Sequence, residues 1–247
     1  MRRFILPPET FTGNGTVTVT GAPFRHMARA LRLAAGDRVL LADGSGREFR
    51  GTIRRVEAAS LTIDLAELAP VATPEAGPRL TLLQGLPKGD KMDLIVQKAT
   101  ELGVAAIVPL LAGRSVPRLA PERSAARLER WRRIAREAAR QSGRATVPVV
   151  APLQTLPEAL RQSAAELRLF LWEGEHEQHL RTVLAATSPP ASVELLVGPE
   201  GGFSAAEAAA ATAGGFSPTC LGRRILRTET AGLAVLAVLQ YLWGDLG

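Results

Sequence analysis

From residue 80 onward, short apolar runs alternate with helical patterns, and this alternation restricts the possible folds more than any other feature of the chain. Each apolar run has the length of a buried strand, and the segments between carry apolar residues at helical spacing. This alternation is typical of an α/β domain with a mainly parallel sheet. The strands are expected at Leu80–Leu86, Ala105–Leu111, Leu167–Trp172, Val193–Val197 and Phe216–Leu221.

The helix expected at Pro121–Ser142 is strongly amphipathic, because apolar residues such as Trp131 and Ile134 fall on one arc and arginines fill the opposite one. Asp90 is the expected cap of an earlier helix that ends at Gly103. Ser204 and Glu207 form a capping box for a helix that continues to Ala213. The remaining helices are expected at Thr155–Glu166, at Glu175–Ala186 and from Thr228 onward.

Residues 1–72 have a different pattern. Thr16–Thr20 alternates as a strand does, Pro23–Leu33 reads as a helix, and residues 38–65 read as a hairpin-rich meander. Together they indicate a small β-barrel domain. Prolines and glycines punctuate residues 73–79, which we interpret as a linker before a second domain at 80–247.

Composition argues against several kinds of site. Cys220 is the only cysteine and there are three histidines, so an internal disulfide is excluded and a metal centre is not expected. The apolar stretch near the N-terminus is too short for a signal peptide. The longest apolar run, Ala231–Trp243, falls short of the ~20 residues that a membrane span needs. We expect a cytoplasmic protein without metal or membrane.

The positive charge indicates a polyanionic partner. The formal net charge is +6 and the pI about 10.5, which first suggests nucleic acid. Three of the 30 basic residues are lysines, and Lys88, Lys91 and Lys98 fall within eleven residues. This cluster suggests sites that need a compact ammonium rather than a planar guanidinium. A solvated surface and coincidence are the alternatives.

Two loops near the C-terminal end have the composition of a small-molecule site. Gly198–Phe203 is glycine-rich and follows an apolar strand, and Leu221–Thr228 is set with cations before the last helix. Neither loop has the spacing of a dinucleotide fingerprint or of an ATP phosphate loop. A ligand with carboxylate, amine, ribose and purine parts could instead be held by main-chain groups and apolar walls. The alternative is an ordinary glycine turn.

Four segments resemble the RsmE family, the small-subunit ribosomal RNA uracil-N3 methyltransferases of the SPOUT superfamily. They are Lys88–Val104, Arg130–Arg144, Leu195–Ser204 and Leu221–Ala231. The resemblance implies a PUA-like β-barrel at the N-terminus and a C-terminal α/β domain with a deep trefoil knot. It also implies a homodimer that uses S-adenosyl-L-methionine to methylate N3 of a uridine in 16S ribosomal RNA of the small subunit.

In the family the cofactor lies among three loops, which correspond here to Leu171–Gly174, Gly198–Phe203 and Leu221–Thr228. The resemblance thus implies cofactor contacts by Leu171, Trp172, Glu173, Gly198, Pro199, Glu200, Gly201, Gly202, Leu221, Gly222, Ile225, Leu226, Arg227 and Thr228.

Uracil N3 carries a proton at neutral pH, so the reaction needs in-line placement and either a base or a cation that stabilises the uracil anion. Arg227 is the candidate for electrostatic stabilisation or for positioning the RNA, and Glu229 or Glu200 is the candidate proton acceptor. The structural alternative is that Glu229 caps the last helix and pairs with Arg227. Two other functions stay open, a knotted methyltransferase acting on ribose 2′-OH and a non-catalytic RNA-binding assembly factor.

Cations from both expected domains are candidates for RNA contact. They are Arg25, Arg29, Lys88, Lys91, Lys98, Arg130, Arg144, Arg223 and Arg224.

Overall fold

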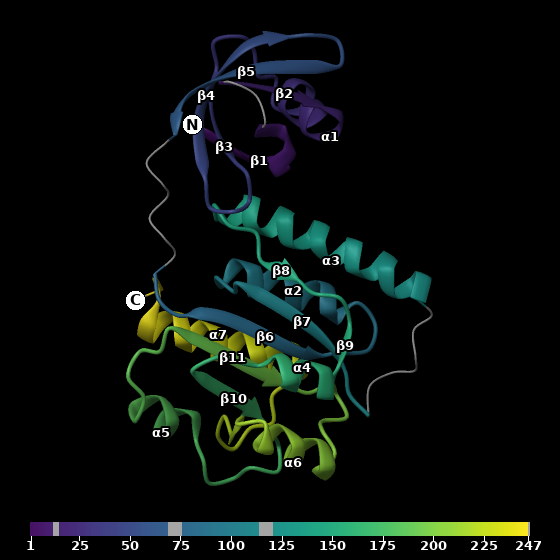
Figure 1. The fold of residues 1–247 in the computed structure, drawn as a ribbon, viewed down its shortest axis with the longest axis vertical. Helices are drawn as coiled ribbons and strands as arrows, with labels where there is room; N and C mark the ends of the chain where they lie inside the picture. Colours follow the sequence, from purple (N-terminus) through teal and green to yellow (C-terminus); the bar gives the residue numbers. More distant parts are fainter. Residues whose placement is uncertain (12–14, 69–75, 114–120, 247) are drawn as a thin grey trace. The chain divides into compact units, whose positions relative to one another are not determined.

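The computed structural model describes residues 1–11, 15–68, 76–113 and 121–246, and it leaves the side chains of residues 67, 68, 121 and 122 undescribed. The chain separates into two compact units (Figure 1). One comprises Met1–Pro74 with Ala139–Val147, and the other comprises Glu75–Ala138 with Pro148–Gly247. The division into 1–72, 73–79 and 80–247 stays a prediction, because residues 69–75 lie outside the described part of the chain.

The first unit is built on a five-stranded sheet in the order β1-β3-β4-β5-β2, in which β1 and β3 are parallel and the other neighbours antiparallel. The alternation in β2 places Val17 and Val19 in the core and the threonines in solvent. The expected small β domain is confirmed. The strands are β1 (Arg2–Ile5), β2 (Thr16–Thr20), β3 (Arg38–Ala42), β4 (Glu48–Val56) and β5 (Ser60–Leu68).

The helix expected at Pro23–Leu33 begins and ends earlier than predicted. It consists of α1 (Gly21–Phe24) followed by a π-helical turn, η2 (Arg25–Ala30), and a short 3-10 helix, η1 (Pro8–Phe11), precedes β2. Arg32 has a positive φ of 53°, a left-handed conformation that is typical just beyond a helix end. Loop 43–47 of this unit also pairs with the segment after the 121–142 helix, where the Val147 N–H donates to the Gly44 carbonyl at 3.0 Å.

The second unit is built on a seven-stranded sheet in the order β12-β10-β11-β6-β7-β8, with β9 also paired to β7, and every pair is parallel. This confirms the α/β class. The strands are β6 (Arg79–Gly85), β7 (Ala106–Leu111), β8 (Val149–Val150), β9 (Gln154–Thr155), β10 (Leu167–Leu171), β11 (Ser192–Val197) and β12 (Ser217–Thr219).

Helices cover both faces of this sheet. On one face α7 (Thr228–Trp243) packs on β6, on β11 and on α2 (Lys91–Glu101). On the other, α4 (Leu156–Gln162) and α6 (Ala205–Ala213) contact each other over a core that includes Leu83, Phe170 and Phe203. Within the described residues, no helix has both the length and the apolar character needed to cross a membrane.

Two helices are shorter than predicted. The helix expected at Glu175–Ala186 is α5 (Leu180–Ala185), and α4 covers only part of Thr155–Glu166. In the first case the Glu175 carboxylate accepts the N–H groups of Glu177 and Gln178 at 2.8 and 2.9 Å. These local bonds fix a turn where a helix was expected, because a side chain that binds nearby backbone competes with the helical hydrogen bonds. The 22-residue helix α3 (Pro121–Ser142) has the predicted bounds.

Candidate functional site

A cleft of about 390 Å³ lies at the carboxyl ends of three adjacent strands of the second unit. β12, β10 and β11 are neighbours in the sheet and run parallel, so the loops that follow them leave from the same edge. Ligands bind in this position in open α/β sheets. The walls come from residues 171–176, 197–203 and 219–228, together with Ala231 of α7.

The predicted cofactor residues gather at this cleft, since all of them except Gly201 line it. Of the predicted catalytic residues, Arg227 and Glu200 line it, whereas Glu229 lies behind Thr228 at the start of α7 and is not part of the wall. Several other lining residues adjoin the predicted cofactor contacts in the same segments and were not predicted as contacts themselves. They are Glu175, His176, Val197, Phe203, Thr219, Cys220 and Ala231.

The glycine-rich loop is packed too closely for side chains at two points. Gly202 has a φ of +63°, and a Cβ there would lie 2.8 Å from Oε1 of Glu173 across the cleft. A Cβ on Gly85, at the end of β6, would lie 2.5 Å from Cδ of Pro199. Phe203, at the end of the loop, packs its ring edge-on against the ring of Phe170, with 5.2 Å between the ring centroids. This contact holds the loop against the core. The predicted Ser204–Glu207 capping box follows and is confirmed.

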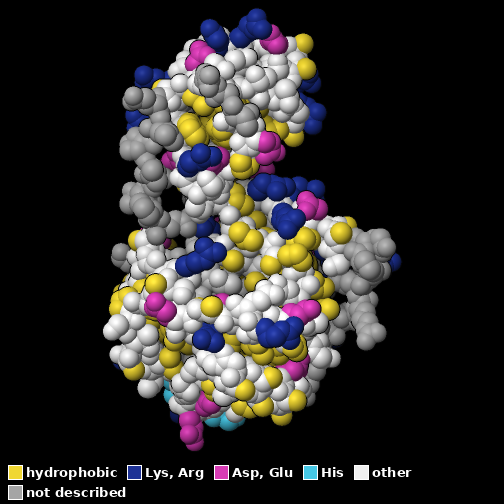
Figure 2. Space-filling view, in the orientation of Figure 1, with side chains coloured by type: hydrophobic (Ala, Val, Ile, Leu, Met, Phe, Trp, Pro, Cys, Tyr) yellow, Lys and Arg dark blue, Asp and Glu magenta, His cyan; other side chains and the backbone are white. Residues whose placement is uncertain are grey.

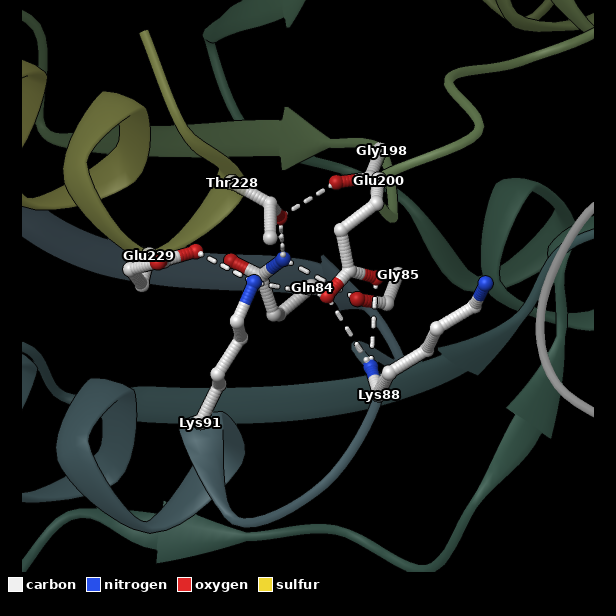
Figure 3. A network of polar contacts seen from close by, with 8 residues as sticks. All are labelled: Gln84, Gly85, Lys88, Lys91, Gly198, Glu200, Thr228 and Glu229. Atoms are coloured by element: carbon white, nitrogen blue, oxygen red, sulfur yellow. Dashed lines mark hydrogen bonds and ion pairs between the residues drawn. The ribbon is translucent and has the colours of Figure 1, made fainter.

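A buried amide connects two walls of the cleft (Figure 3). Nε2 of Gln84 donates to the Thr228 hydroxyl at 2.9 Å and to the Gly85 carbonyl at 3.0 Å. The Thr228 hydroxyl in turn donates to the Gly198 carbonyl at 2.6 Å. Gln84 is fully buried, so the carbonyl and hydroxyl have no water to replace this amide. Gln84 was not among the predicted site residues, although a polar residue within an apolar strand is a signal for such a role.

A charged cluster connects the same walls nearer the solvent (Figure 3). Nζ of Lys91, the first residue of α2, lies 2.9 Å from Oε1 of Glu200 and 3.3 Å from Oε2 of Glu229. The main-chain N–H of Lys88 also donates to Glu200, at 3.1 and 3.2 Å to its two oxygens.

This cluster shifts two pKa values. Burial disfavours the charged form of Glu200, but hydrogen bonds from Lys91 and from main-chain N–H groups outweigh it and hold the pKa of this carboxyl below its ordinary value. The hydrogen bond to Glu200 raises the pKa of Lys91, against a smaller effect of desolvation. Glu200 and Lys91 are therefore both charged near neutral pH.

The predicted RNA-contacting cations are placed differently from one another. Arg223 and Arg224 line the cleft, and both are exposed. Lys98 pairs with Glu101 at 2.8 Å, and Arg130 pairs with Asp93. In the view of Figure 2, basic side chains lie at several separate places on the surface.

The first unit holds Arg25 and Arg29, both exposed on η2, and Arg144, which donates to the Thr146 hydroxyl at 3.1 Å. Among the residues that the structure describes, no group of three or more His, Cys, Asp or Glu is arranged to hold a metal ion.

Residues 74–240 match the family model of an RNA methyltransferase domain, and residues 19–65 match that of an RNA methyltransferase PUA domain. The chain is 36% identical over 244 residues to ribosomal RNA small subunit methyltransferase E of Synechocystis sp., covering 97% of this chain and 77% of the relative. It is 33% identical over 231 residues to the enzyme of the same name from Bacillus subtilis, covering 92% and 90%.

Two solved structures resemble the whole chain. Ribosomal RNA small subunit methyltransferase E of Neisseria gonorrhoeae, bound to S-adenosyl methionine, gives a TM-score of 0.88 at 36% identity, with all of both chains covered. A methyltransferase of Legionella pneumophila, in complex with the bound cofactor SAM, gives 0.86 at 32% identity, covering 99% of this chain and 98% of that one.

Proposed function

The chain belongs to the ribosomal RNA small subunit methyltransferase E family, and from this we propose that it methylates N3 of a uridine in 16S ribosomal RNA with S-adenosyl-L-methionine as the methyl donor. The observation that carries the proposal is the cleft itself. Loops from three adjacent parallel strands form it, and nearly all residues expected to hold the cofactor line it. Its volume lies in the range typical of small-molecule sites, ~300–1,000 Å³.

The residues present fit this cofactor. Gly202 has a φ of +63°, a conformation that favours glycine, so the loop presents main chain rather than a side chain to the cleft at this point. Ile225 lines the cleft with 86% of its surface exposed, and an adenine ring stacked on it would cover apolar area that is otherwise in water. We assign Leu221, Ile225 and Leu226 to the adenine wall, and the main chain of Gly198–Gly202 to the polar parts.

When bound, S-adenosylmethionine supplies an electrophilic methyl carbon on a sulfonium. The chain must bring uracil N3 in line with it and favour loss of the N3 proton. Arg227 lines the cleft and is exposed, as are Arg223 and Arg224, and we assign to its guanidinium the stabilisation of the uracil anion. Glu200 is a poor proton acceptor, because its oxygens already accept three hydrogen bonds and its pKa is lowered.

Replacing Arg227 with alanine should lower the rate of methyl transfer about 10²-fold, the effect expected when one charge-stabilising group is lost. Cofactor affinity should fall less than the rate does, because the proposed role concerns the uracil although Arg227 also lines the cofactor cleft. Tritiated methyl transfer to small subunits that lack the modification measures the rate. Arg161→Ala, an exposed arginine of α4 outside the cleft, is the matched control and should transfer methyl at the wild-type rate.

Mass spectrometry of the nucleosides decides between the proposed function and its alternatives. Methyl on the base at N3 supports it, whereas methyl on the sugar would assign the ribose 2′-OH. RNA binding without S-adenosylmethionine binding would assign a non-catalytic assembly factor. If the cofactor binds and no methyl is incorporated into small subunits, the proposed substrate is wrong.

Lys88→Ala should weaken RNA binding and reduce the slope of log K against log salt concentration by about 0.7–0.9, the loss of one phosphate contact. The Lys88 side chain points away from the charged cluster in Figure 3, whereas its main chain belongs to it. The substitution should therefore leave cofactor affinity unchanged. Titration of a labelled small-subunit RNA at several salt concentrations measures the RNA affinity and its salt slope. An unchanged slope would mean that Lys88 does not contact the RNA.

We further propose a cytoplasmic homodimer with a trefoil knot, an RNA-binding domain at residues 1–72 and a catalytic domain at 80–247. Supporting the dimer, α7 exposes Val238, Tyr241 and Leu242 by 39%, 67% and 49%, a stripe that a second copy would cover. Sedimentation of the purified protein tests the dimer.

Supporting the knot, the chain leaves the edge strand β12 and returns through residues 220–227 to α7, which packs on β11 and β6.

A further inference from the structure

Lys91 contacts one wall of the cleft, at Glu200, and the residue that follows the wall residue Thr228, at Glu229. Its ammonium lies 2.9 Å from Glu200, which belongs to the loop between β11 and α6. It also lies 3.3 Å from Glu229, in the first turn of α7 and directly after the loop that begins at Leu221. α6 and β12 separate these two loops in the sequence, and Lys91 is remote from both, so one side chain from α2 connects segments that come together only in the folded sheet.

The charges of this cluster argue against an RNA contact by Lys91. One ammonium faces two carboxylates, so the group carries a formal net charge of −1 and does not attract phosphate. The Lys91 side chain is 34% exposed, and those of Glu200 and Glu229 are 21% and 22% exposed, so the contacts are shielded in part from water. A compact ammonium can donate to both carboxylates, which explains a lysine in a chain that otherwise uses arginine.

We infer that Lys91 is a positioning residue of the cofactor cleft, whose ammonium holds Glu200 and Glu229 together and thereby sets the separation of the two loops that form its walls. The inference rests on the proposed function of the cleft. Without the ammonium, two carboxylates face each other and repel. Since Glu200 itself lines the cleft and Glu229 adjoins Thr228, which also lines it, this repulsion moves cleft residues directly.

The matched control is Lys88, three residues earlier, whose side chain points away from the cluster (Figure 3). Lys91→Met should weaken S-adenosylmethionine binding about 10-fold in calorimetry without RNA, whereas Lys88→Met should leave it unchanged. Lys91→Met should leave the salt dependence of RNA binding unchanged, the opposite of Lys88→Met. Lys91→Arg, which keeps the charge but not the compact ammonium, should recover only part of the affinity.

Removing the repulsion should rescue the variant. In the triple variant Lys91→Met, Glu200→Gln, Glu229→Gln, cofactor affinity should return to within about 3-fold of the Glu200→Gln, Glu229→Gln double variant. Hydrogen exchange of residues 198–203 and 225–229 should quicken in Lys91→Met and not in Lys88→Met, which tests the positioning role without any ligand.

The outcomes separate this inference from the proposed function. A wild-type protein that binds no S-adenosylmethionine overturns the proposed function, and the exchange measurement then still decides whether Lys91 holds the loops. Normal cofactor affinity in Lys91→Met, with a reduced salt slope for RNA, overturns the inference and assigns Lys91 to RNA. Equal loop exchange in Lys91→Met and Lys88→Met also overturns it.

Discussion

Gly85→Ala should displace the glycine-rich loop and weaken S-adenosylmethionine binding at least about 30-fold. A Cβ at residue 85 would lie 2.5 Å from Cδ and 2.6 Å from N of Pro199, and 2.9 Å from the carbonyl carbon of Gly198. Two of these atoms are main chain, so no rotamer change relieves the overlap. Overpacking of this kind costs about 1–3 kcal/mol where the surroundings cannot move.

The overlap should lower the free energy of unfolding as well as the cofactor affinity, because β6 and β11 are adjacent central strands of the sheet. For a chain of this size, each 1 kcal/mol lowers Tm by about 2–4 °C. Gly113→Ala is the matched control, since a Cβ there meets its nearest atom, Oε1 of Glu207, at 3.5 Å. Calorimetric cofactor titration and thermal unfolding of both variants measure the difference. Cofactor affinity at the wild-type level in Gly85→Ala would show that the loop moves freely.

The parts of the fold that the sequence predicts are those set by local pattern. Period-two alternation placed β2, and helical spacing placed α3 at its observed bounds. The composition of Gly198–Phe203 and of Leu221–Thr228 indicated a small-molecule site, whereas Leu171–Gly174 was assigned only by resemblance to the family. The predicted start of α5 was wrong for a local reason too, because the Glu175 carboxylate accepts nearby N–H groups that a helix would need.

What the sequence does not predict is pairing across long separations. Gln84 and Thr228 are 144 residues apart, and nothing in either local pattern identifies the other as its partner. The lysine cluster is a case where composition was informative but the interpretation incomplete. The signal that a compact ammonium is needed fits Lys91, but the carboxylates that it contacts are on segments more than a hundred residues away. Ala139–Val147 groups with the first unit for the same reason, because its contacts, such as that of Val147 with Gly44, join segments about a hundred residues apart.

Thr228→Val should lower cofactor affinity about 10-fold and destabilise the second unit by about 1–3 kcal/mol, the cost of leaving buried polar groups without partners. Valine has nearly the shape of threonine, so the change removes a hydroxyl rather than volume. The Gly198 carbonyl then loses its donor, and the Gln84 amide loses one acceptor. The Gly198 carbonyl and the Gln84 amide lie where β6, the glycine-rich loop and α7 meet. Without the hydroxyl between them, these elements no longer fix the separation of the cleft walls.

A second substitution separates the loss of this bridge from a general loss of stability. Thr212→Val is the matched control, because the Thr212 hydroxyl donates to the Ala208 carbonyl of its own helix, α6. It should change cofactor affinity by less than about 2-fold, as no hydrogen bond of the cleft depends on it. If Gln84 and Thr228 act as one unit, Gln84→Leu combined with Thr228→Val should cost less than the sum of the single changes, by about 0.5–3 kcal/mol. Strict additivity in this cycle would mean that the amide and the hydroxyl support the cleft independently, and the buried bridge would not be what connects its walls.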